Sequence, residues 1–170
     1  PYAGMLEVLE QAEREGLGLW EIVERHEGAA IWHYLCRVWK SLQKTIATGL
    51  NAEGRLPGTL NVSRKASAYH ARAQSLAGYF GQTALQFAYA LAVSEENAAG
   101  GEVVTAPTCG ACGVLPAVLF FLQGHARLSD EKICRALATA GMIGNIVKRN
   151  ASTSAPEIGC QGEVGTACAM

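Results

Sequence analysis

The last twenty residues of the chain hold its densest group of side chains that could do chemistry. Two thiols, two carboxylates and three glycines stand there among small residues, namely Cys160, Cys168, Glu157, Glu163, Gly159, Gly162 and Gly165. Glycine has no Cβ atom and lets the backbone approach a ligand closely. The segment stops at Met170 without a charged tail. We therefore predict a ligand or metal site in this segment, cut near its middle.

Cys160 is the candidate metal ligand of this segment. A last helix is predicted to begin near Gly159, which would place Cys160 at its N-terminus, where backbone N–H groups and the helix dipole favour a thiolate. Cys168 follows eight residues later, so both thiols would lie within about 80° of each other around the helix. Cysteine thiolates hold iron–sulfur clusters, but a cluster here would need two further ligands. Cys168 is instead predicted to be a buried small residue.

The carboxylates have a chemical and a plainer interpretation. Glu157 and Glu163 could act as acid or base, or orient a substrate amine, and they could equally belong to a solvated helix start. Glu95 and Glu96 precede a glycine break, which favours a solvated helix end. Two basic pairs could bind a carboxylate, although surface charge is their default reading: Arg64 with Lys65, and Lys148 with Arg149.

The pair Cys109 and Cys112 offers a different chemistry. Two cysteines at this spacing before a helix can support redox reactions, because the helix N-terminus lowers a thiol pKa. A thioredoxin-like site needs a preceding strand, and a zinc site needs a second pair, and the sequence predicts neither. Small core or turn residues are the favoured interpretation. Cys36 and Cys134 lie on apolar helix faces and are predicted to be core, and the four dispersed histidines to be surface or satisfied core residues: His26, His33, His70 and His125.

Composition limits the classes of function. The 170 residues are 49% apolar and only 17% charged, with a net charge of -1, so nothing in the charge predicts nucleic acid or an anionic membrane as a partner. The longest apolar run, Val114 to Leu122, is less than half a membrane span. No signal peptide is visible at the start, which favours reduced thiols and a cytoplasmic protein. The low charge also leaves open a helical module that binds a partner or a second copy.

The spacing of apolar residues predicts an all-α fold in a single domain. Helices are expected over seven ranges and again from about 159, the seven being 5–14, 17–28, 29–50, 69–76, 78–97, 114–126 and 130–147. The helix at 114–126 is apolar on all sides and is predicted to be central. Residues 51–65 contain helix breakers and predict an ordered loop, as do residues 148–156.

Several motifs, in order, resemble the α domain of the iron–sulfur-dependent bacterial L-serine dehydratases. The likeness runs from about Met5 to Met170 and rests on residues 56–58, 61–65, 90–101, 104–108, 110–113 and 159–165. The last two motifs are the most specific. The chain departs from the family at Cys109, where Asn or Ala is commoner, and at residues 154–156, where Ser-Gly-Ala is usual.

The resemblance implies a helical catalytic domain with a [4Fe–4S] cluster held by three cysteines. Cys160, in the Gly-Cys-Gln-Gly-Glu motif, corresponds to the first ligand, and the other two belong to a later segment that this chain does not contain. Residues 1–170 are therefore expected to be a partial catalytic domain, metal-free and inactive alone. The family's second domain, the β domain, is also expected to lie outside this chain, and the complete protein to be a homo-oligomer.

The implied reaction is the conversion of L-serine to pyruvate and ammonia. A cluster iron would act as a Lewis acid on the hydroxyl group, and a base would remove the α-proton. Lys65 and Glu163 are the candidates for a catalytic role, while Asn97, Thr108 and Ser154 are candidates for substrate contacts, because they stand in the matching motifs. A redox or zinc protein using Cys109 and Cys112, and a helical partner-binding module, remain as alternatives.

Overall fold

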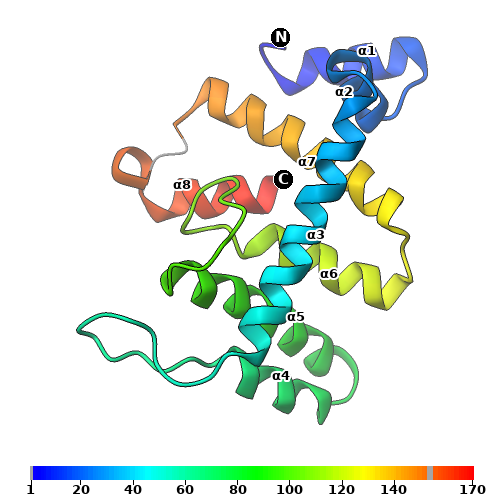
Figure 1. Cartoon of the computed structure of the whole chain (residues 1–170). Coiled ribbons are helices and arrows are strands. Elements are labelled where there is room, and N and C mark those ends of the chain that lie inside the picture. The colour runs from blue at the N-terminus through cyan, green and yellow to red at the C-terminus, as the bar shows by residue number, and fades with distance from the viewer. Residues whose placement is uncertain (1, 153–154) are drawn as a thin grey trace.

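The computed structural model describes residues 2–152 and 155–170, and over these ranges the chain is all α-helical (Figure 1). The helices are α1 Met5–Glu15, α2 Leu19–Glu27, α3 Ala30–Asn51, α4 Ala66–Gln74, α5 Gly78–Ala98, α6 Val114–Ala126, α7 Asp130–Asn150 and α8 Ala155–Ala169. The extended pairing within these ranges is one isolated bridge, between Arg55 and Ser63 in the loop before α4. The all-α prediction is confirmed.

Local signals explain most helix boundaries. Ser129 caps α7, since its hydroxyl accepts a hydrogen bond from the Lys132 N–H at 3.3 Å. The same helix runs to Asn150, three residues beyond its predicted end. Its last turn contacts the N-terminal segment, because the Arg149 guanidinium donates to the Tyr2 carbonyl at 2.9 Å and the Asn150 amide to the Ala3 carbonyl at 2.7 Å. These distant contacts extend the helix into residues predicted to be loop.

Helix α3 forms the axis of the domain and packs against α2, α4, α5, α6 and α7 (Figure 1). Its buried side chains include Trp39 and Leu42, which join α6 and α7 in the main apolar cluster. Further along, Gly49 lets α3 cross α5 closely, because a Cβ atom there would overlap the Ala92 carbonyl oxygen. The buried apolar residues of α3 recur every three or four positions, at Leu35, Trp39, Leu42 and Ile46, and so share one face of the helix.

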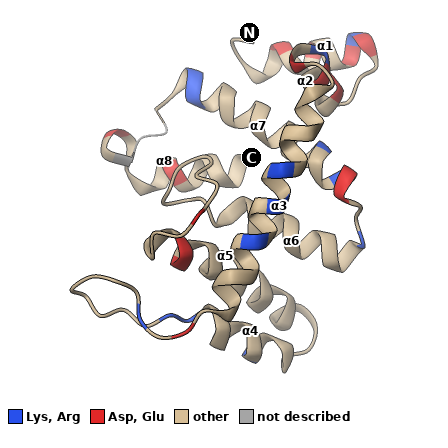
Figure 2. Ribbon diagram, in the orientation of Figure 1, with Lys and Arg blue, Asp and Glu red and all other residues tan. Residues whose placement is uncertain are grey.

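Helix α6 packs against α3, α5, α7 and α8, in agreement with its predicted central place. It carries no Lys, Arg, Asp or Glu, and Figure 2 shows its ribbon without charge. One side of it nevertheless faces outward, where Val118 and Leu122 are 40% and 39% exposed. Among the described residues, no helix is both long enough and apolar enough to cross a membrane.

Candidate functional site

The end of α5 places two buried carboxylates beside the loop that precedes α4. Glu95 is 5% exposed and accepts hydrogen bonds from the backbone N–H groups of Lys65, at 2.6 Å, and Ala66, at 3.3 Å. These N–H groups lie at the start of α4, where a helix has no internal acceptors for them. Glu95 therefore caps α4 from another helix, and this explains why α4 begins three residues earlier than Tyr69, its predicted start.

The neighbouring carboxylate, Glu96, forms an ion pair with Arg64. Its Oε1 lies 2.7 Å from the Arg64 Nη1, and both side chains are only 11% exposed. The prediction that Glu95 and Glu96 form a solvated helix end is therefore wrong. Both carboxylates fix the family-like segment Asn61–Lys65 against α5 (Figure 2 shows their charge at the end of that helix).

Asn97, the next residue of α5, contacts a second loop. Its amide Nδ2 donates a hydrogen bond to the Cys109 carbonyl at 3.0 Å. The loop containing Cys109 runs into the start of α6, where the Ala111 N–H donates to the Thr108 hydroxyl at 3.3 Å. Three consecutive residues at the end of α5 thus hold two loops that are more than thirty residues apart in sequence.

Glu163 on α8 completes the attachment of this second loop. The carboxylate is 7% exposed and accepts hydrogen bonds from the Thr108 hydroxyl and, at 3.1 Å, from the Gly110 N–H. A Cβ atom at position 110 would lie only 2.6 Å from Glu163 Oε1, so this approach requires glycine. Of the two interpretations of Glu163, the structure excludes the solvated one.

Cys160 lies one turn before Glu163, directly after a break in α8. Gly159 has φ 71° and ψ 173°, a conformation that interrupts the helix and favours glycine. The helix resumes at Cys160, so the thiol stands at the start of a helical segment as predicted, and it is exposed. Cys168 is also exposed, which contradicts its predicted burial. Glu157 is exposed and fits the solvated interpretation.

The donor set fits one cluster ligand rather than a complete metal site. Among the described residues, no group of three or more His, Cys, Asp or Glu side chains could hold a metal ion. An exposed thiol at the start of a helical segment has the chemistry of a single thiolate ligand to a cluster. Cys160 therefore fits as one ligand of such a group, and the described residues do not offer a complete set of ligands beside it.

The pair Cys109 and Cys112 does not have the properties of a redox site. Cys109 is exposed, but Cys112 is buried in a small apolar cluster with Ile46 and Val93. Burial raises the pKa of the Cys112 thiol, and the nearby Cys109 and Glu163 raise it further. A catalytic thiol needs the opposite shift. Cys109 lies in a turn and Cys112 in the core, which are the roles that the sequence predicted.

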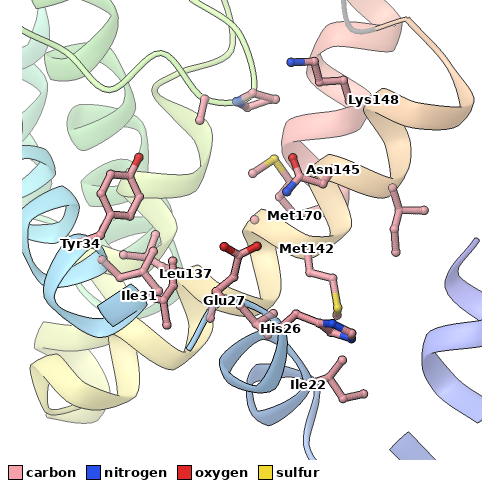
Figure 3. A pocket seen from close by; sticks show the side chains of 18 of the residues that line it. Ile22, His26, Glu27, Ile31, Tyr34, Leu137, Met142, Asn145, Lys148 and Met170 are labelled. Carbon is pink, nitrogen blue, oxygen red and sulfur yellow. The ribbon is translucent and has the colours of Figure 1, made fainter. Parts of the chain in front are cut away.

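Two hollows border the loops. The smaller, about 220 Å³, includes Lys65 and Glu95 together with Leu56 and Ser94 in its lining. The larger, about 740 Å³, lies between α2, α3 and α7 and is closed on one side by residues 105–107 and Met170. Figure 3 shows Ile31 and Tyr34 on one side of this cavity and Asn145 and Lys148 on the other.

The structure gathers most of the predicted site residues around the end of α5. Lys65, Asn97, Thr108 and Glu163 lie in segments joined by the contacts above, and Cys160 lies on the same helix as Glu163. Ser154 is outside the described residues. Sequence reasoning missed the positioning roles of Glu95, Glu96 and Arg64. The sequence offered one signal for these roles. It was a pair of adjacent acids before a glycine break, with a basic pair about thirty residues earlier.

Comparison with known proteins gives a consistent family. Residues 5–170 match the model of a family described as serine dehydratase alpha chain. The chain is 43% identical over 180 residues to an L-serine dehydratase of Haemophilus influenzae, covering 100% of this chain and 40% of that protein. It is 44% identical over 160 residues to L-serine dehydratase 1 of Escherichia coli, covering 91% and 35%. For an L-serine dehydratase of Streptomyces coelicolor the identity is 42% over 172 residues, covering 96% and 38%. The chain thus spans about 40% of the length of the curated relatives it matches.

Proposed function

Because this chain belongs to the serine dehydratase alpha-chain family, we propose that it is part of an L-serine dehydratase, a lyase that converts L-serine to pyruvate and ammonia. One observation in particular supports this. Glu163 joins two family-like motifs in space, since its carboxylate holds both the Thr108 hydroxyl and the Gly110 N–H. The segment that carries Cys160 is thereby fixed against the loop that carries Thr108, one of the candidate substrate contacts.

The residues of this chain have separable roles in the proposed site. Cys160 would hold one iron of a [4Fe–4S] cluster, and the chemistry that such a cluster supplies when bound is Lewis-acid assistance to the departure of the serine hydroxyl group. Glu163 acts as a positioning residue, because both of its hydrogen bonds go to the loop. Lys65 is exposed and borders the smaller hollow, so we propose it as the residue that contacts substrate or moves a proton.

Asn97 and Thr108 orient the loop before α6 through their hydrogen bonds. The Asn97 amide donates one N–H to the Cys109 carbonyl, and its second N–H and its carbonyl oxygen are the atoms that would contact a substrate carboxylate or amine. The Thr108 hydroxyl donates to Glu163 and accepts from the Ala111 N–H. These two hydrogen bonds fix the conformation of the loop, and a direct contact with substrate would use the remaining lone pair of the Thr108 hydroxyl oxygen.

The relatives are longer than this chain, and we extend the proposal to the complete protein. We propose that it contains the missing cluster ligands and a second domain, forms a homo-oligomer and works in the cytoplasm. The test is anaerobic expression of the complete gene, with iron content and conversion of serine to pyruvate measured on the same sample. Turnover that scales with iron content supports the proposal. Iron-loaded protein that leaves serine unchanged would overturn it.

A further inference from the structure

Two cysteines far apart in the sequence touch each other at a place unrelated to the proposed dehydratase site. The Sγ atoms of Cys36 on α3 and Cys134 on α7 are 3.3 Å apart, although 98 residues separate them. A disulfide bond is about 2.05 Å long, so the sulfur atoms need to approach by only about one ångström. We propose that Cys36 and Cys134 are a modification site, at which an oxidised low-molecular-weight thiol converts the pair to a reversible intramolecular disulfide.

The two thiols have different surroundings, and this difference predicts which of them reacts first. Cys36 is exposed and can be reached by a small disulfide, whereas Cys134 is 2% exposed inside the main apolar cluster. Burial raises the pKa of Cys134 to about 12, and its hydrogen bond with Cys36 contributes in the same direction. Cys134 therefore keeps its proton at neutral pH, and its S–H can donate toward the Cys36 sulfur. Cys36 is the sulfur that meets the oxidant first.

The reaction balances as two thiol–disulfide exchanges with glutathione disulfide. In the first, the Cys36 thiolate attacks one sulfur of glutathione disulfide, whose S–S bond breaks and releases a glutathione thiolate. In the second, Cys134 loses its proton to that released base or to water and attacks the Cys36 sulfur, and the second glutathione leaves. The two protein thiols are oxidised to one disulfide, and one glutathione disulfide is reduced to two glutathione molecules.

Other cysteines of the chain lack this arrangement. Over the described residues, the contact between Cys36 and Cys134 is the one direct sulfur–sulfur contact recorded. Cys109 and Cys112 stand close in sequence, but Cys112 packs in a different cluster from Cys134. A bond between Cys36 and Cys134 would link α3 to α7 and close a loop of about a hundred residues, which restricts the unfolded chain and raises the unfolding temperature.

The test treats the protein with glutathione disulfide, alkylates the remaining thiols, and maps the linked peptides by mass spectrometry after proteolysis. The expected product joins Cys36 to Cys134, and the oxidised protein unfolds several degrees higher than the reduced one. A matched variant, Cys109→Ser with Cys112→Ser, keeps both results. The Cys36→Ser substitution lies at an exposed position and removes both.

Two results would overturn the inference. One is a Cys36 that stays bound to glutathione while Cys134 is still a free thiol when the oxidised protein is unfolded and alkylated. The other is a linked peptide that joins different cysteines in equal or greater yield. Because the mapping uses the unsubstituted protein, it decides the question even where a variant folds poorly.

Discussion

Trp39 on α3 and Glu163 on α8 are both buried, and different contacts hold them. Trp39 is 1% exposed and packs among Leu35, Leu42 and their neighbours, with its indole N–H on Asp130 at 3.2 Å. Glu163 is 7% exposed and is held by hydrogen bonds from the loop before α6. The core region tolerates many apolar sequences, whereas the site region depends on particular donors and acceptors at particular positions.

The largest effect should come from the core. Replacing Trp39 by Ala removes the largest fully buried side chain and leaves a cavity, so we expect the free energy of unfolding to fall by about 3–5 kcal/mol. Tyr79, which is 75% exposed, is the matched aromatic control, and Tyr79→Ala should change it by less than about 0.5 kcal/mol. Urea denaturation measures both. Equal losses in the two variants would contradict the assignment of the core to α3.

The ion pair at the end of α5 should give the next largest effect. A double-mutant cycle on Arg64 and Glu96 is expected to show a coupling energy of about 1–3 kcal/mol, because both groups are largely removed from water. Lys44 and Glu102 form the comparison pair, with side chains 73% and 78% exposed. That pair should show no measurable coupling. Similar coupling in both cycles would remove the distinction between a buried anchor and surface charge.

The Glu163→Gln variant separates the charge of this residue from its size. The Thr108 hydroxyl and the Gly110 N–H both donate to Oε1, and the amide keeps an oxygen there but loses the negative charge that strengthens both hydrogen bonds. We therefore expect a local loss of about 1–2 kcal/mol. Hydrogen exchange at the Gly110 amide should then speed up by roughly 5–30-fold. Glu157→Gln, at an exposed carboxylate, should leave that exchange unchanged. An unchanged rate in Glu163→Gln would mean that the loop is held by something else.

The Cys134 thiol should have the smallest effect, which is a dependence of the free energy of unfolding on pH at alkaline pH. Burial raises the pKa of its thiol from 9.0 to about 12 in the folded protein, so over that interval the unfolded state loses the proton first. The thiol's contribution to stability is therefore present below pH 9 and is lost as the pH rises toward 12, so the free energy of unfolding falls over that interval. Denaturation at several pH values should show this slope in the reduced wild type and a shallower one in Cys134→Ala. Parallel slopes would contradict it.

The contrast between the apolar core and the polar contacts of the site also explains which features can be predicted from the sequence. The helix predicted over residues 29–50 follows from the local spacing of apolar residues, and it is confirmed as α3. Cys36, expected in the core, is exposed, and so is Cys168, because the local spacing of apolar residues does not fix which side of a helix its neighbours cover at each position. Glu95 and Glu96 have partners about thirty residues away, and only the folded chain brings a carboxylate to those N–H groups. A buried polar contact between distant segments leaves no periodic pattern.

The proposed role of Cys160 is tested most directly by two single substitutions in the complete protein, prepared anaerobically. Both cysteines are exposed on α8, so Cys168→Ser is the matched control for Cys160→Ser. Iron content and cluster absorbance should be lost in Cys160→Ser, together with serine turnover, and retained in Cys168→Ser. Retention of iron and absorbance in Cys160→Ser would contradict the assignment of this thiol as a cluster ligand.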